Sequence, residues 1–173
     1  MRKYRNKLLA AAGAVVAAGA VAVSGLTAAS AATAAPRPSV SGIEFFQLVT
    51  TSATSNKESI IALGNVFTAG GVDHQGSKTD LAVFPGGTFK IRHFRGHGTS
   101  SFNPTTCLAR INRHGTYRLR DGTGKYAGIS GHGRYRLKIR FVAARNPNGS
   151  CSHSKPPAAF QQIIKAHGPV TLP

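Results

Sequence analysis

Seven histidines are the side chains of this 173-residue sequence best suited to acid–base chemistry or metal binding. Most stand beside glycine in segments typical of turns. None belongs to an H-E-x-x-H motif or to another spacing typical of zinc ligands. The sequence therefore predicts no metal site and no cofactor. The seven are His74, His93, His97, His114, His132, His153 and His167.

Two further kinds of chemistry lack their motifs. Serines are plentiful, but there is no G-x-S-x-G nucleophile elbow and there are only three aspartates, which argues against a hydrolase. Gly122, Gly124 and Gly128 have the spacing G-x-G-x-x-x-G, but a dinucleotide site needs a helix directly after its glycines. The residues that follow alternate with a period of two, as in a strand. These glycines are instead expected to form a tight turn at a corner of a sheet.

Residues 1–34 have the pattern of a secretory signal peptide. Four basic residues within the first seven precede an uncharged run, and Ala32-Thr33-Ala34 fits a small-x-small cleavage site. A retained membrane anchor is the rival interpretation. The run is mostly Ala and Gly, however, and no basic stop-transfer cluster follows it. We expect cleavage, a secreted protein and no membrane span in the mature chain.

The only cysteines are Cys107 and Cys151, both in the part expected to be exported. An even number of cysteines in an oxidising compartment predicts a disulfide. Neither belongs to a C-x-x-C pair, which argues against a metal site or a reactive thiol. Closing a loop of about 45 residues is worth on the order of 4 kcal/mol in the chain-entropy model.

The mature chain would be strongly basic. Without the four basic residues of the signal peptide, 18 basic and 5 acidic residues remain, a net charge of +13 with neutral histidines. Such a charge favours anionic partners, such as anionic envelope polymers or lipids. A solvated surface that merely keeps strand edges soluble is the alternative.

Short runs of apolar and β-branched residues, separated by Gly, Pro and Asn, predict an all-β chain. Pro85-Gly86-Gly87 predicts a hairpin turn. Two polar segments, residues 96–106 and 146–157, are expected to be exposed loops, and each holds or abuts one cysteine. The expected strand segments are residues 43–50, 59–71, 80–94, 107–122, 134–141 and 158–172.

The clearest alternation lies between residues 134 and 141. Tyr135, Leu137, Ile139 and Phe141 share one face, and the four basic residues Arg134, Arg136, Lys138 and Arg140 share the other. We expect the apolar set to face the interior together with Phe89, Ile91, Tyr117 and Leu119. Tyr117, Tyr135 and Phe141 would then point inward, and no aromatic side chain is evident on the outer face for stacking on nucleic-acid bases. Specific nucleic-acid binding is therefore not expected.

His93 and Arg113 continue inward-facing alternations. A polar side chain inside a closed sheet is costly unless it is paired or solvated, so it often marks the ligand end of a cavity. A register break, for instance at Gly115, would instead turn either residue outward.

The stretch GTGKYAGISGHGRY, Gly122 to Tyr135, resembles the G-[ST]-G-x-[FY]-x-G-x-x-G stretch of the allene oxide cyclase and dirigent-like proteins. The exported part is most similar to small secreted actinobacterial proteins with an allene-oxide-cyclase-barrel-like domain. The stretches FFQLVT, VFPGGT, FNPTTC and IKAHGPVTL carry that likeness. The resemblance implies a single eight-stranded antiparallel β-barrel over residues 43–173, after a linker of residues 35–42. It also implies a lumen that can hold a small apolar molecule.

The plant cyclases act on a fatty-acid epoxide with the help of a carboxylate and an ordered water. Glu44 is the carboxylate of this sequence that the resemblance makes comparable. Its neighbours Ile43 and Phe45 do not reproduce the plant pattern. The competing expectation is a rim or exterior Glu44 that pairs with an arginine.

Three functions follow as hypotheses. The favoured one is a secreted barrel that binds a small apolar or amphipathic ligand in its lumen. The second is a cationic envelope-associated protein that acts through its outer surface. The third is an isomerase or cyclase, which would need an inward-facing carboxylate or another group that handles protons.

Overall fold

The computed structural model describes residues 38–173, so the expected signal peptide, residues 1–34, and the first residues of the expected linker lie outside the described part. Within it there are eight strands and one short 3₁₀ turn, Gly124–Tyr126. No helix among these residues is long and apolar enough to cross a membrane. The strands are β1 Val40–Thr50, β2 Lys57–Gly64, β3 Thr68–His74, β4 Thr79–Phe84, β5 Gly87–Asn103, β6 Leu108–Arg120, β7 Ser130–Val142 and β8 Ala159–Leu172.

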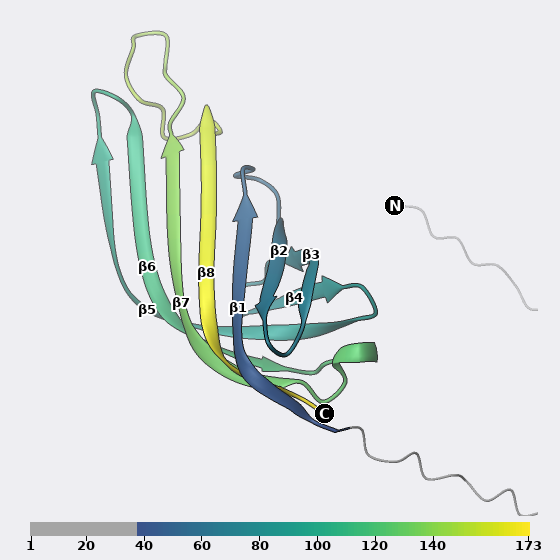
Figure 1. Cartoon of the computed structure of the whole chain (residues 1–173). Coiled ribbons are helices and arrows are strands. Elements are labelled where there is room, and N and C mark those ends of the chain that lie inside the picture. Colours follow the sequence, from purple (N-terminus) through teal and green to yellow (C-terminus); the bar gives the residue numbers. More distant parts are fainter. Residues whose placement is uncertain (1–37) are drawn as a thin grey trace, which may run out of the picture. The chain divides into compact units, whose positions relative to one another are not determined.

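The eight strands form one antiparallel sheet that closes in a ring. Each strand pairs with the next along the chain, and β8 pairs with β1 from Val40 opposite Leu172 to Thr50 opposite Gln162 (Figure 1). The prediction of an all-β chain with eight antiparallel strands is confirmed. Closure leaves no unpaired edge on β1 or β8.

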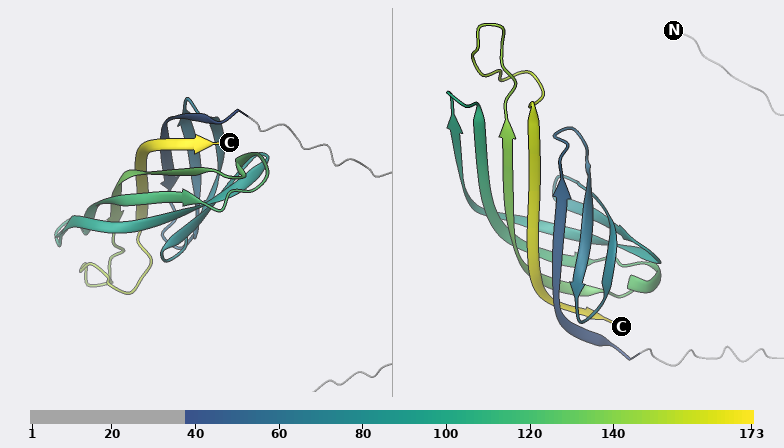
Figure 2. Two further views of the ribbon diagram at one scale, coloured as in Figure 1. Left: turned by 90° about the horizontal axis from the view of Figure 1, so that it is seen from below. Right: turned by 45° about the horizontal axis from the view of Figure 1, so that its top comes forward.

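Strands β5 to β8 are longer than β2 to β4 and project beyond them at one end of the ring (Figures 1 and 2). The expectation of a loop over residues 96–106 is therefore wrong for residues 96–103, which continue β5 and pair with β6 again from Gly98 onward. All of these residues are exposed. The second expected loop, residues 146–157, belongs to none of the eight strands. Its Cys151 forms an isolated β-bridge with Arg145, just before the loop.

The strand alternation separates a buried from an exposed face. On β7 the residues from Tyr135 to Ile139 that were expected inside are half-buried, and the basic residues between them are exposed. At the end of the ring opposite the projection, six aromatic side chains pack with ring centroids 5.1 to 6.2 Å apart. They close this end: Phe46, Phe67, Phe84, Phe89, Tyr117 and Tyr126.

The expected corner glycines lie in the turn between β6 and β7. Gly124 and Gly128 have φ angles of +57° and +78°, in the left-handed region that side chains rarely adopt. A Cβ at Gly124 would also collide with the carbonyl of Gly86, in the turn between β4 and β5. Gly122 has no positive φ, but a Cβ there would meet the carbonyl of Tyr126.

Cys107 and Cys151 form the predicted disulfide, with Cα atoms 5.5 Å apart. It joins the turn between β5 and β6 to the loop between β7 and β8. The guanidinium of Arg145 adds to this link because it donates to the carbonyls of Thr105 and Gly149, both at 2.6 Å. The two connections at the projecting end are thus held together.

Candidate binding site

A cavity of about 400 Å³ lies inside the ring. It occupies the end from which β5 to β8 project, because the loop between β3 and β4 lines it at Gln75, Gly76 and Ser77. Phe46 and Tyr117 of the aromatic cluster form its floor. The volume falls in the range of pockets that bind small organic molecules. Its apolar walls come from β1, β5, β6, β7 and β8. The wall residues are Leu48, Ile91, Ile111, Leu119, Leu137, Ile139, Ile164 and Ala166.

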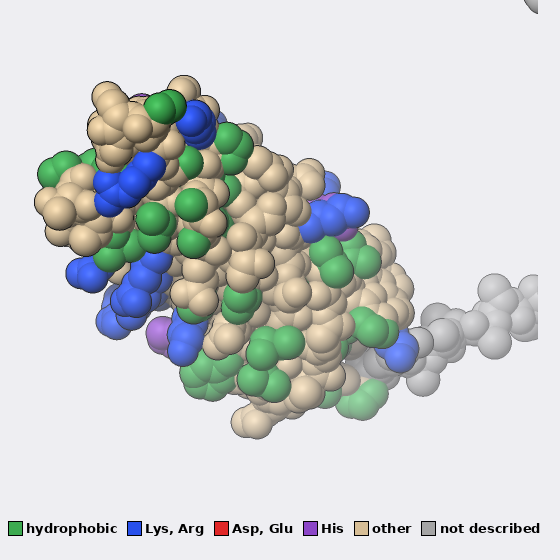
Figure 3. All heavy atoms as spheres, turned by 90° about the horizontal axis from the view of Figure 1, so that it is seen from above, with side chains coloured by type: hydrophobic (Ala, Val, Ile, Leu, Met, Phe, Trp, Pro, Cys, Tyr) green, Lys and Arg blue, Asp and Glu red, His purple; other side chains and the backbone are tan. Residues whose placement is uncertain are grey.

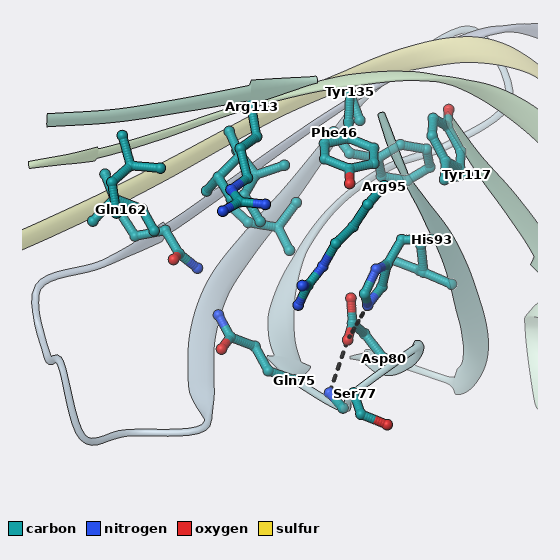
Figure 4. A pocket seen from close by; sticks show the side chains of 18 of the residues that line it. Phe46, Gln75, Ser77, Asp80, His93, Arg95, Arg113, Tyr117, Tyr135 and Gln162 are labelled. Carbon is teal, nitrogen blue, oxygen red and sulfur yellow. Dashed lines mark hydrogen bonds and ion pairs between the residues drawn. The ribbon is translucent and has the colours of Figure 1, made fainter. Parts of the chain in front are cut away.

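Two arginines point into this cavity, Arg95 from β5 and Arg113 from β6 (Figure 4). Neither forms a salt bridge with a carboxylate of residues 38–173. Arg95 stands just before a register shift in β5, between Arg95 and Gly98, and pairs with Gly115. The register break therefore lies in β5 and not at Gly115. Arg113 stays on the inward face of β6, together with Ile111 and Tyr117.

Asp80 and His93 form a pair at the cavity wall. The Nε2 atom of His93 lies 3.4 Å from Oδ1 of Asp80, which also accepts a hydrogen bond from the Gly76 amide at 2.8 Å (Figure 4). The hydrogen bond to Asp80 raises the pKa of His93, and desolvation opposes the shift only in part. The pair thus places an imidazole that can gain or lose a proton beside an apolar space.

Two further carboxyl groups lie behind this wall. Glu58 on β2 stands opposite Asp73 on β3, and both are buried. The side-chain amide of Gln162, which lines the cavity, donates to Oε1 of Glu58, whereas neither oxygen of Asp73 has a hydrogen-bond partner within residues 38–173. Burial, together with a smaller contribution from nearby Asp80, raises the pKa of each carboxyl to about 7. At neutral pH these groups can therefore hold protons inside the ring.

Glu44 does not occupy the exterior position that we expected for it. It is fully buried near the closed end, where its Oε2 accepts long hydrogen bonds from the amides of Val66 and Phe67, at 3.3 and 3.4 Å. The expectation of a partner arginine on the rim or exterior is wrong. Burial raises its pKa. Glu44 does not line the cavity, which it could reach only past the aromatic floor.

Eight of the ten residues expected in the lumen line the cavity. Phe89 belongs to the packed aromatic cluster below it. Phe141 shares the inner face of β7 but is half-buried farther along the projecting sheet, opposite Phe160. The eight are Ile91, His93, Arg113, Tyr117, Leu119, Tyr135, Leu137 and Ile139.

Sequence reasoning missed several polar residues of the site. Arg95 continues the alternation of Ile91 and His93 by one step, so the pattern could have found it. Glu58 likewise shares the face of Ile60 and Ala62. The sequence around Asp73 shows no apolar alternation. The inward neighbours on its strand are Gly71 and Ala69, which have little or no apolar side chain.

No group of three or more His, Cys, Asp or Glu side chains in residues 38–173 is arranged to hold a metal ion. Comparisons of this chain with protein-family models, with curated proteins and with solved structures found no match.

Proposed function

We propose that the protein binds a small apolar or amphipathic molecule in the cavity of the closed sheet. The observation that carries the proposal is the hollow itself. One end of the ring is filled by six packed aromatic rings, yet the other end leaves about 400 Å³ between apolar walls. Packed interiors rarely leave such a space, and filling it with an apolar ligand recovers the missing contacts.

The polar side chains favour an amphipathic ligand with an anionic group. Arg95 and Arg113 point into the cavity without a carboxylate partner, and a guanidinium is suited to a planar anion such as a carboxylate. The apolar part of such a ligand would lie toward the aromatic floor, against Phe46 and Ala166. The side-chain amides of Gln75 and Gln162 offer further hydrogen bonds around its polar end.

The proposal has two further parts, the family of barrel to which the ring belongs and the export of the protein from the cell. We infer that the ring is a barrel like that of the allene oxide cyclase and dirigent-like proteins. The glycine stretch from Gly122 to Tyr135 and the order of the other resembling stretches support this. We also infer secretion after loss of residues 1–34. Support comes from the sequence of those residues and from the Cys107–Cys151 disulfide, a bond typical of oxidising compartments.

Titration of a sulfonated naphthalene fluorophore into the protein tests the proposal. The probe should brighten on binding, and Leu137→Trp should reduce its affinity at least tenfold, because the indole would occupy part of the cavity. Leu81→Trp is the matched control, since Leu81 is exposed on β4. No probe binding to the parent protein, or equal binding to both variants, would refute a luminal site.

The Asp80–His93 pair favours an isomerase or cyclase as a second candidate. A general base must lie beside the bound molecule, and His93 lines the cavity, where the hydrogen bond to Asp80 raises its pKa. An unsaturated fatty-acid epoxide is the substrate to test, because the resembling plant enzymes use one. Enzymatic cyclisation should be lost in His93→Gln with probe binding retained. A product distribution identical to that of the spontaneous reaction in buffer would exclude this activity.

A further inference from the structure

We propose that the outer face of β2, β1, β8 and β7 docks on an anionic lipid bilayer. This docking face joins an exposed apolar patch to a row of cations that have no acidic partner. It lies on the opposite side of the sheet from the cavity and does not depend on the luminal ligand.

The apolar half of the docking face lies on β1 and β2. Four large side chains are exposed there, and Phe45, the most exposed, keeps 53% of its surface accessible. Phe45 and Leu63 stand directly opposite one another in the register of the two strands. Aliphatic and aromatic side chains in this arrangement can enter the boundary between lipid headgroups and acyl chains. The apolar patch consists of Ile43, Phe45, Ile61 and Leu63.

The cationic half lies on β7 and β8. Arg136 stands opposite Lys165 on β8 and opposite His114 on β6, and Arg134 stands opposite His167. Like charges that stand opposite one another, as Arg136 and Lys165 do, destabilise a sheet. Among residues 38–173 no carboxylate offsets them, because Glu44, Glu58, Asp73 and Asp80 lie inside the ring and Asp121 contacts Lys90 and Arg120. An anionic surface would relieve this repulsion.

The two halves form one continuous surface. The register places Leu63, Phe45, His167 and Arg134 in a single row across β2, β1, β8 and β7. The ring of Phe45 stacks on His167, with centroids 6.1 Å apart, and His167 stands opposite Arg134, so the apolar patch adjoins the cationic half. Figure 3, which shows the end with the projecting strands, also displays basic and hydrophobic side chains and no acidic one.

A bilayer fits this combination better than a nucleic acid or a linear polyanion. Bases need free aromatic faces, but the ring of Phe45 already stacks on His167. Arg92 and Arg118 likewise lie over Phe94, an exposed aromatic on β5, at 5.1 and 5.9 Å from its centroid. A polyanion would be bound by charge alone and would leave Ile43 and Leu63 unused. Only an anionic bilayer offers phosphate groups to the cations and an apolar phase to the patch.

Co-sedimentation of the full chain with vesicles tests the proposal. Vesicles of phosphatidylcholine with one-third phosphatidylglycerol should bind the protein, and pure phosphatidylcholine vesicles should bind it at least tenfold more weakly. The triple variant Arg134→Gln/Arg136→Gln/Lys165→Gln should lose at least tenfold in affinity, because each cation near an anionic surface adds to binding. The control Lys78→Gln/Lys125→Gln/Lys155→Gln removes the same charge outside the docking face, from the β3–β4 loop, the 3₁₀ turn and the β7–β8 loop, and should bind almost normally. All variants share residues 1–37, so any contribution of that segment cancels.

A second pair of variants separates lipid insertion from simple charge attraction. Phe45→Gln should weaken vesicle binding several-fold without weakening the binding of single-stranded oligonucleotide. Phe102→Gln, on the inner face of the projecting sheet opposite Ala109, should change neither. Equal losses in the two triple variants would overturn the proposal. So would vesicle binding that Phe45→Gln leaves intact, which would point to a surface for polyanions.

Discussion

Glu58 on β2 stands directly opposite Asp73 on β3, and both carboxyl groups are buried inside the ring of strands. Two carboxylates in such contact would repel one another and would lose their hydration. Burial therefore raises the pKa of each to about 7. In a protein with only five acidic residues, these two are placed where their charge is costly.

This pair predicts that the protein is more stable at mildly acidic than at mildly alkaline pH. The ordinary pKa values, 4.5 and 3.8, describe the unfolded chain, so between about pH 4 and pH 7 the folded state binds more protons. Stability is then greatest near pH 4 to 5 and falls as the pH rises through 7. His93, whose pKa is also raised, acts in the same direction. Thermal unfolding should show a melting temperature several degrees higher at pH 5 than at pH 8.

Neutral isosteres identify the groups responsible. Glu58→Gln and Asp73→Asn remove the proton uptake, so each should flatten the fall in melting temperature between pH 5 and pH 8. Asp121→Asn is the control, because Asp121 is half-exposed and pairs with Lys90 on the surface. A melting temperature that rises with pH in the parent protein would contradict the assignment of raised pKa values.

The period-two pattern was a sound guide where one face of a strand is covered. On β7, Leu137 and Ile139 face the cavity and Lys138 faces solvent, as the sequence predicts. The pattern failed where neither face is covered. In residues 96–103 the strand is held by backbone pairing with β6 alone. Both faces are exposed, so the sequence there does not alternate between apolar and polar residues.

The polar content of the interior was harder to predict for a different reason. Charged residues normally avoid closed interiors, so Glu44 was expected outside and Asp73 was not considered. The fold, and not the local sequence, accommodates them: the amides of Val66 and Phe67 donate to Glu44, and burial raises the pKa of Asp73 to about 7. Neither environment can be read from the neighbouring sequence.

The turn before β7 should tolerate no side chain at its left-handed glycines. Gly124→Val and Gly128→Val each force a β-branched residue to a positive φ, and at Gly124 the new Cβ meets the Gly86 carbonyl. We expect losses of about 1–3 kcal/mol, or several degrees in melting temperature. Gly70→Val is the matched control, because a Cβ added at Gly70 would meet no atom within 4 Å and the residue has no positive φ. Equal melting temperatures for all three variants would remove the turn argument.

Processing and the disulfide can be checked together by intact mass. Secreted protein should begin near Ala35 and should label with no thiol reagent unless it is first reduced and unfolded. Because the bond between Cys107 and Cys151 constrains 44 residues of chain, the Cys107→Ser/Cys151→Ser variant should lose on the order of 4 kcal/mol of stability. A secreted mass that retains residues 1–34, or full thiol labelling of native protein, would contradict this prediction.

The two cavity arginines should select ligands by charge. Arg95 and Arg113 face the cavity without a carboxylate partner, so an anion bound there gains a charge-assisted hydrogen bond, worth about 1.5–3 kcal/mol. Arg113→Gln should therefore weaken binding of the sulfonated fluorophore by roughly ten- to a hundredfold, by the same energy scale. A neutral fluorophore of the same ring system should lose less than threefold.

Arg110→Gln is the control for this prediction, because Arg110 lies on the same strand, is exposed on the outer face and stands opposite Arg140. It should leave the affinity for both probes unchanged. If Arg113→Gln and Arg110→Gln weakened the anionic probe equally, the probe would be sensing the general positive charge of the protein. A loss confined to Arg113→Gln and to the anionic probe is the result that places the anionic group of the ligand inside the ring.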